Sequence, residues 1–244
     1  MSFCSLTRLL PTMLAPLAGC VAPLYRPTVP STPLLTKGQV QVSAGVRNLN
    51  APEAGAAWAP TQHLLLSAES ALAGGSSDSY HRQLGLGAGY YRASAAARPY
   101  LAVLVGAGWA DATEHGSTTY LTLGLGLASH PVTYQASYWR YYGQAYLAGS
   151  LSPKVMGGFS LRATYVDYTR LAVNSQAFAP DNRAFLEPTL FLKGGSGPVQ
   201  VQGTVGLSLP FRTGASSQSG NATAPTSSLL GVALILRPNL LKQH

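Results

Sequence analysis

Apolar residues alternate with small polar residues along most of this chain, and this period-two pattern constrains the fold more than any other feature. In residues 39–47, valine and alanine alternate with Gln, Ser and Arg, and residues 199–209 repeat the pattern. Such alternation is typical of a β-strand with one apolar and one polar face. The chain is apolar on average, with a mean hydropathy of +0.13. Past the leader, no apolar run approaches the ~18–20 residues of a membrane helix. The sequence therefore predicts an all-β fold.

The strands and the connections between them point to a barrel. Ten strands are expected, at 38–48, 52–60, 63–73, 81–93, 99–111, 138–149, 155–169, 183–193, 198–210 and 227–237. Short connections at 60–62, 94–98, 150–154 and 194–197 alternate with longer polar ones at 74–80, 112–137, 169–182 and 212–226. This arrangement is typical of a closed antiparallel transmembrane β-barrel with short periplasmic turns and long outer loops.

The stretch 112–137 leaves two strand counts open. Leucines alternate with Thr and Gly over 121–127, which is a strand pattern, and 132–138 follows as another. If both belonged to the wall, the barrel would have twelve strands, and the next strand would span only 144–150. That is shorter than the ~9–11 residues of a tilted spanning strand. We therefore prefer ten wall strands with a β-hairpin that continues above the membrane.

A soluble β domain, such as a sandwich or a lipocalin-like barrel, would show the same alternation with its apolar face turned inward. Soluble domains usually cover their outer face with Lys, Glu and Asp. This chain has four lysines, and only 10% of its residues are charged, against roughly 25% in typical soluble proteins. The membrane barrel is the preferred interpretation, and a soluble periplasmic, lipid-anchored β domain remains the alternative.

The N-terminal region predicts secretion and lipid anchoring. Arg8 precedes an apolar run at 9–18, and Leu17-Ala18-Gly19-Cys20 resembles a bacterial lipobox. We expect 1–19 to be a lipoprotein signal peptide, Cys20 to be acylated, 20–37 to be a lipidated Pro-rich tether and 38–244 to be the barrel domain. An ordinary secretory signal with a chance cysteine is the alternative. Val21 is not an inner-membrane retention signal, so the predicted location is the outer membrane of a Gram-negative bacterium, with the lipid on the periplasmic leaflet.

Several short motifs carry a family resemblance. The motifs are Cys20 with its Pro-rich tether, Lys-Gly-Gln-Val-Gln at 37–41, Phe-Leu-Glu-Pro at 185–188 and Gly-Leu-Ser-Leu-Pro at 206–210. Together they resemble those of a group of lipobox-bearing bacterial outer-membrane β-barrel proteins of uncharacterised, porin-like type. The resemblance implies a barrel without an assigned activity. One departure stands out: the last strand runs into Arg237-Pro238 and lacks the terminal aromatic residue that is usual in such barrels.

Charged residues on the inward face are the candidate site. Alternation points these side chains into the lumen: Arg47, Glu69, Arg140, Arg162 and Glu187. Buried charges must be paired or hydrated, and an ion pair between Glu187 and Arg162 on the adjacent strand is expected. The lumen is either a ligand site or ion path, or a structural plug. The plug is favoured because ten strands leave little room once side chains fill the interior.

The predicted partners are lipids. Interfacial aromatic residues are expected in two groups, Trp58, Tyr90, Tyr91 and Tyr100 near the periplasm and Trp109 and Trp139 near the outer face. The barrel wall and acylated Cys20 would contact membrane lipid, and arginines at strand ends suit lipopolysaccharide phosphates. The net charge is +8, but the basic residues are scattered, which argues against nucleic acid. A monomer is expected.

Catalytic and metal-binding patterns are weak. No histidine has metal-ligand spacing to another ligand, and no cofactor is predicted. Convergence of Asp111, Glu114 and His115 at one rim, as in outer-membrane proteases, is one interpretation, but a polar loop is the commoner explanation. The glycines of 85–89 lie mid-strand and indicate close packing inside the barrel. The sequence predicts a non-enzymatic structural or surface-binding barrel with a largely plugged lumen, with a narrow pore as the alternative.

Overall fold

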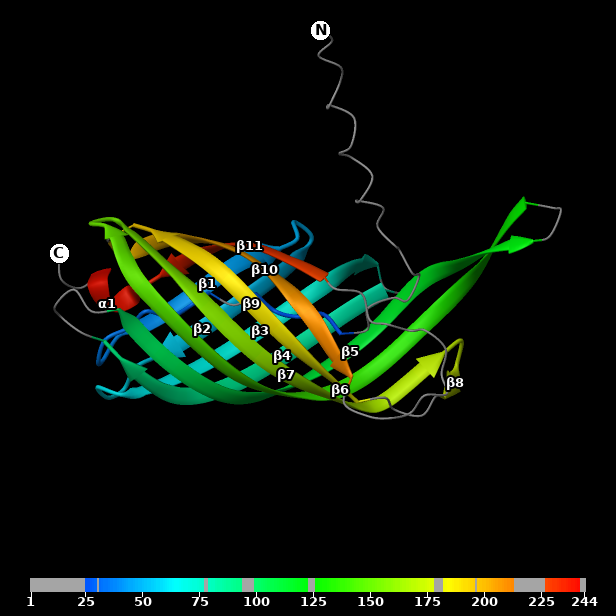
Figure 1. Ribbon diagram of the computed structural model, residues 1–244, viewed down its shortest axis with the longest axis horizontal. Helices are drawn as coiled ribbons and strands as arrows, with labels where there is room; N and C mark the ends of the chain where they lie inside the picture. The colour runs from blue at the N-terminus through cyan, green and yellow to red at the C-terminus, as the bar shows by residue number, and fades with distance from the viewer. Residues whose placement is uncertain are drawn as a thin grey trace, which may run out of the picture.

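The chain folds into a closed antiparallel β-barrel (Figure 1). The computed structural model describes residues 25–29, 31–76, 79–93, 99–122, 126–177, 182–195, 197–212 and 227–241. The strands are β1 (Val40–Arg47), β2 (Ala51–Trp58), β3 (Leu64–Ser76), β4 (Ser79–Arg92), β5 (Tyr100–Thr122), β6 (Gly126–Ser152), β7 (Val155–Val173), β8 (Gln176–Ala177), β9 (Arg183–Gly194), β10 (Val199–Arg212) and β11 (Ser227–Leu236). A short helix, α1 (Pro238–Leu241), follows.

Each wall strand pairs with its neighbours in sequence, and β1 closes the ring against β11. β7 skips β8 and pairs with β9, because β8 is a two-residue strand that pairs only with the end of β7. The wall therefore has ten strands, and the predicted fold class and strand number are confirmed. Burial alternates residue by residue along β4 and β11, as the period-two sequence pattern predicts.

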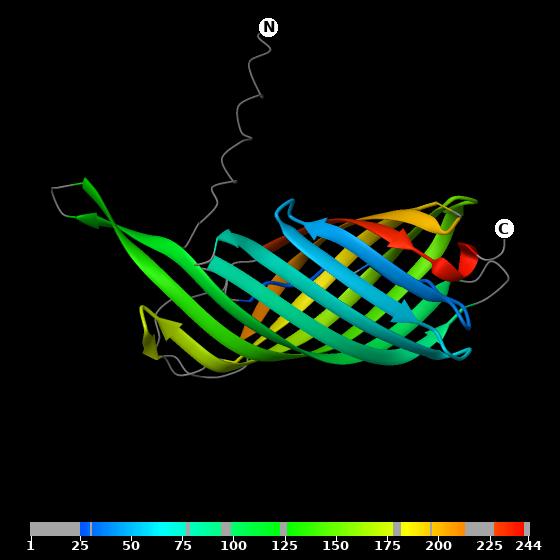
Figure 2. The ribbon, with the colours of Figure 1, turned by 180° about the vertical axis from the view of Figure 1, so that it is seen from behind.

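The two ends of the barrel differ in their connections. At the short-turn end, β2–β3, β4–β5, β6–β7 and β9–β10 are joined, and β1 begins and β11 ends. The opposite, long-loop end carries the β5–β6 hairpin, β8 and the long connection between β10 and β11. The hairpin extends well beyond the rest of the wall in Figures 1 and 2, as expected for ten strands rather than twelve.

One predicted loop is wrong. The connection expected at 74–80 is largely strand, because β3 runs to Ser76 and β4 starts at Ser79. Gly74 has a φ of +104°, and a Cβ there would lie 2.2 Å from the carbonyl oxygen of Ser79. Only glycine adopts this conformation readily, so the polar composition that suggested a loop instead marks an irregular position near the end of β3, where its register with β4 shifts.

The outer face of the wall is apolar. In β1, β2, β9, β10 and β11, every outward position of the described residues is uncharged. Large apolar side chains on this face are about half exposed, for example Val105 at 66%, Leu86 at 64% and Leu190 at 59%. A water-soluble protein does not expose a contiguous apolar surface that spans several neighbouring strands. No helix among the described residues is long and apolar enough to cross a membrane.

The aromatic residues divide between the two faces. Trp58, Tyr90, Trp109 and Trp139 are 42–53% exposed on the outer wall, and Trp109 faces Trp139 across β5 and β6. Tyr91 and Tyr100, which we predicted at the periplasmic interface, instead point inward and are 1% and 7% exposed. The reason is the strand period: Tyr90 and Tyr91 are consecutive, so they must point to opposite faces.

Candidate functional site: the filled lumen

The N-terminal coil lies inside the barrel. Residues 25–29 and 31–36, here called the lumen segment, run as extended chain along the lumen, and Tyr25, Thr28, Val29, Thr32, Leu34 and Leu35 are at most 8% exposed. Figure 1 shows this blue coil within the ring of strands. The Pro-rich stretch that we predicted as a tether therefore packs within the barrel over these residues.

Lumen side chains satisfy the backbone of this segment. Thr32 N donates to Gln202 Oε1 at 3.1 Å, and the carbonyl of Thr32 accepts from Lys193 Nζ at 2.6 Å. The carbonyl of Pro33 accepts from the Tyr146 hydroxyl at 2.7 Å. An extended Pro-rich chain has no internal hydrogen bonds, so a buried one needs such partners. The polar inward face of the wall supplies them.

A charged cluster surrounds the middle of the segment. Glu69 forms ion pairs with Arg140 and Arg162, and Arg162 Nη2 lies 3.0 Å from Glu69 Oε2. Thr28 of the lumen segment sits between the two guanidinium groups and accepts from Arg162 at 2.8 Å and from Arg140 at 3.3 Å. The ring of Tyr142 lies 4.5 Å from Arg162 Cζ. The segment is thus held by the same arginines that balance Glu69.

Glu187 does not form the ion pair that we predicted. It faces Arg162 across β7 and β9, but the guanidinium of Arg162 turns to Glu69. Glu187 Oε1 instead accepts from the hydroxyl of Tyr25 at 2.7 Å, and Oε2 accepts from Thr164 at 3.3 Å. Sequence reasoning placed the carboxylate in the lumen but missed Tyr25, because nothing indicated that the tether enters the barrel.

Aromatic layers close the lumen on both sides of the charged cluster. Toward the short-turn end, Tyr91, Tyr100 and Tyr146 stack with centroid distances of 5.8 and 6.0 Å, next to Leu34 and Leu35. Toward the long-loop end, Tyr25 packs on Phe185 at 4.3 Å and on Tyr138 at 6.1 Å. Both layers contain residues of the lumen segment, so the segment is part of the core of the barrel.

The fifth predicted lumen residue, Arg47, pairs with Glu53 at 2.7 Å and is 5% exposed. Near the long-loop end, Arg26 pairs with Glu114 at 2.6 Å. Glu114 points inward, whereas Asp111 and His115 lie on the opposite face of β5. The rim cluster considered from sequence is therefore not assembled. No group of three potential metal ligands occurs within the described ranges.

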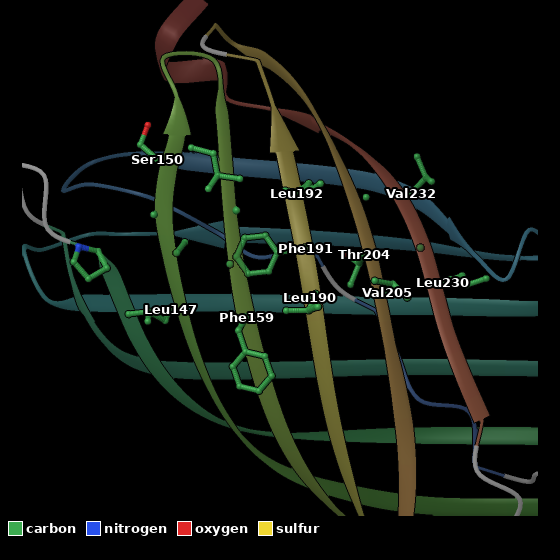
Figure 3. Close-up of a pocket in the computed structure, with 18 of the residues that line it drawn as sticks. Leu147, Ser150, Phe159, Leu190, Phe191, Leu192, Thr204, Val205, Leu230 and Val232 are labelled. Carbon is green, nitrogen blue, oxygen red and sulfur yellow. The ribbon is translucent and has the colours of Figure 1, made fainter.

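Little free volume remains beside the segment. Three cavities that border it measure about 20, 30 and 20 Å³, and each has room for one or two water molecules. A much larger hollow, about 1060 Å³, is apolar and is lined mainly by outward-facing side chains of β6, β7, β9, β10 and β11 (Figure 3). Leu147, Phe159, Leu190, Val205 and Leu230 border it. The large hollow thus belongs to the outer wall.

Gly85 gives a test of how closely the charged cluster is packed. A Cβ at Gly85 would lie 2.6 Å from Arg140 Nη2 and 3.2 Å from Glu69 Cγ. Gly85→Ala is expected to destabilise the barrel by about 1–3 kcal/mol, the usual cost of overpacking a core. Thermal unfolding in detergent, followed by gel mobility, measures the effect. Gly143→Ala is the matched control, since a Cβ there meets nothing within 4 Å; equal losses in both variants would contradict the close packing.

Tyr25 tests whether the lumen segment contributes to stability. Tyr25→Phe keeps the ring on Phe185 but removes the hydroxyl that donates to Glu187. A hydrogen bond to a buried charged group contributes roughly 1.5–3 kcal/mol, so the unfolding midpoint should fall. Tyr141→Phe is the control, because Tyr141 lies on the outer wall and is 47% exposed. An unchanged midpoint in Tyr25→Phe would show that the segment is not seated in the folded protein.

Comparison with known proteins supports the fold. No family model matches the chain, and no curated protein matches it. Among solved structures, the translocator domain of the autotransporter NalP from Neisseria meningitidis has a TM-score of 0.50 at 11% identity, covering 83% of this chain and 89% of that one. The copper transporter OprC (10% identity, 82% of this chain and 43% of that one) and the CymD monoaromatic hydrocarbon channel (9%, 83% and 88%) each have a TM-score of 0.32. The likeness to the NalP translocator domain, together with the closed antiparallel ring of strands, shows that the chain has the fold of an outer-membrane β-barrel.

Proposed function

We propose that this protein is a lipid-anchored barrel of the bacterial outer membrane with a non-enzymatic structural or surface-binding role, whose lumen is sealed by its own N-terminal segment. The observation that carries the proposal is the lumen segment, which lies along the lumen and hydrogen-bonds to the wall. A barrel filled in this way has a stable lipid-facing wall and long loops to present, but no open path through its centre.

The wall supports the membrane location. Its outward face is uncharged along β1, β2, β9, β10 and β11, and exposed Trp58 and Tyr90 lie toward one end while Trp109 and Trp139 lie toward the other. Aromatic side chains favour the boundary between hydrocarbon and headgroups. In a bilayer, acyl chains would fill the hollow bordered by Phe159 and Leu190. The lipobox-like residues Leu17–Cys20 support the anchor and lie outside the described residues.

A narrow pore is the second candidate. The lumen wall is polar, and Arg140 and Arg162 point into it. If the lumen segment left its seat, these guanidinium groups would line a wet path that favours anions. The two functions differ in the state of the segment at rest: seated for the sealed barrel, displaced for the pore.

Planar-bilayer recording of the purified, acylated protein distinguishes the two candidates. The sealed barrel should give no steady conductance steps, because each of the three cavities that border the segment has room for only one or two water molecules. Steady conductance of the native protein that changes in Arg162→Ala would contradict the sealed barrel and support the pore. Gel mobility that differs between boiled and unboiled samples checks in parallel that the protein is a folded barrel.

The membrane location and the anchor need their own measurements. Mass spectrometry of the native N-terminal peptide should find Cys20 acylated at the new N-terminus, and a free thiol would refute the anchor. Cys20→Ala should still fractionate with the outer membrane, since the wall itself is lipid-facing. Recovery of folded Cys20→Ala in the soluble periplasmic fraction would instead support a soluble lipid-anchored β domain.

A further inference from the structure

The direction of the lumen segment is fixed at both of its ends. At the long-loop end, Arg26 pairs with Glu114 at 2.6 Å, and Tyr25 packs on Phe185. At the short-turn end, Arg237, which directly follows β11, donates to the carbonyl of Leu34 at 2.8 Å. The chain therefore enters the lumen at the long-loop end, travels to the short-turn end, and turns there to begin β1.

We propose that the lumen segment enters the barrel from the long-loop face, and that the acyl chains on Cys20 insert into the outer leaflet of the outer membrane. The proposal rests on the proposed function for the acylation and for the orientation of the barrel, with short turns in the periplasm. It replaces the expectation, based on sequence alone, that the lipid lies on the periplasmic leaflet.

The short stretch of chain between Cys20 and Tyr25 excludes a position of the acyl chains in the periplasmic leaflet. Cys20 precedes Tyr25 by five residues, and five extended residues reach about 18 Å at most. The hydrocarbon core alone is about 30 Å thick. Because Tyr25 lies at the long-loop end, Cys20 cannot reach the periplasmic leaflet on the other side of the hydrocarbon core.

The chain before Tyr25 could return to the periplasmic side only through the lumen or along the outside of the wall, and both routes are blocked. Through the lumen, the returning chain would have to displace Leu34, Leu35 and the stacked tyrosines, which fill it beside small cavities. Outside the wall, an extended chain would expose unpaired N–H and C=O groups to hydrocarbon, at a cost of several kcal/mol each. The outer leaflet, in contrast, lies at the same end of the barrel as Tyr25.

The proposal is tested by labelling single cysteines with a membrane-impermeant maleimide on intact cells. The mature protein has no free thiol once Cys4 leaves with the leader and Cys20 is acylated, so each introduced cysteine reports on itself. Ala22→Cys, two residues after the anchor, should be labelled on intact cells to the same extent as Ser217→Cys in the connection between β10 and β11. Lys154→Cys, in the turn between β6 and β7, should be labelled only after permeabilisation.

The labelling pattern distinguishes failure of the outer-leaflet position from failure of the proposed barrel orientation. Labelling of Ser217→Cys but not of Ala22→Cys on intact cells would overturn the outer-leaflet position. Labelling of Lys154→Cys on intact cells, with the other two protected, would instead overturn the orientation in the proposed function. Incorporation of an alkyne fatty acid into the native protein and not into Cys20→Ala reports acylation separately; its absence from the native protein would refute the lipid anchor.

Discussion

Replacing Glu69 with glutamine is expected to lower the free energy of unfolding of the barrel by about 3–5 kcal/mol, the range for breaking a buried ion pair on one side. Arg140 and Arg162 are 0% and 4% exposed, and both form their ion pairs with Glu69. Glu69→Gln keeps the shape of the side chain but leaves two guanidinium groups close together without that charge. The measurement is the temperature at which half of the detergent-solubilised protein changes gel mobility.

Glu114→Gln is the matched control for Glu69→Gln. Glu114 pairs with Arg26, whose side chain is 28% exposed, whereas the side chains of Arg140 and Arg162 are 0% and 5% exposed. Water screens the Arg26 pair more, so its loss should cost less than the loss of the Glu69 pairs. Similar midpoints for the two variants would show that the charged cluster around Thr28 does not hold the wall together. The midpoint of Gly85→Ala should lie between those of the two glutamate variants.

Replacing residues 25–36 with a Gly/Ser linker of equal length is expected to open the lumen. The linker retains the covalent connection to β1 but lacks the Tyr25, Thr28 and Leu35 side chains that fill the interior. It is also flexible, so holding it in the lumen would cost more conformational entropy than holding the Pro-rich chain. Planar-bilayer recordings should change from silence in the native protein to steady steps in the variant.

The same linker in place of residues 214–225, an equally long stretch of the connection between β10 and β11, serves as the control and should leave the barrel silent. Conductance in both variants would indicate a general defect in assembly rather than removal of a seal. Silence in both would contradict the conclusion that the lumen segment closes the barrel, because the wall side chains alone would then fill the lumen.

Most of the barrel wall is predictable from sequence because a single rule governs it. Side chains on a strand alternate between faces, so the apolar series at 39–47 and 199–209 identified both the strands and their lipid-facing side. The same rule placed Glu69, Arg140 and Arg162 on the inward face. An exception arose where turn composition was used instead: the polar residues of 74–80 suggested a loop, whereas β3 runs to Ser76 and β4 begins at Ser79.

The contents of the lumen were not predictable in the same way. Pro27 and Pro33 indicate an extended chain, and an extended chain suits either a solvated tether or a buried filler. What decides between them is the number of hydrogen-bond partners on the facing wall, which depends on pairs distant in sequence. Thr32 with Lys193, 161 residues apart, is one such pair. Without the wall in place, Glu187 likewise had no visible partner other than Arg162.

The route of the chain through the barrel has a consequence for the order of folding. The lumen segment and β1 are joined by a turn at Lys37 and Gly38, so together they form a local antiparallel unit with one arm inside the future ring. The seam between β1 and β11 joins the wall strands most distant in sequence, and its contacts carry the largest loop-closure entropy. A sheet that curls around the inner arm and forms this seam last never has to draw the N-terminal part of the chain through a finished ring. Once the seam is closed, the wall surrounds the inner arm on all sides, and the arm can leave only by sliding lengthwise out of the lumen.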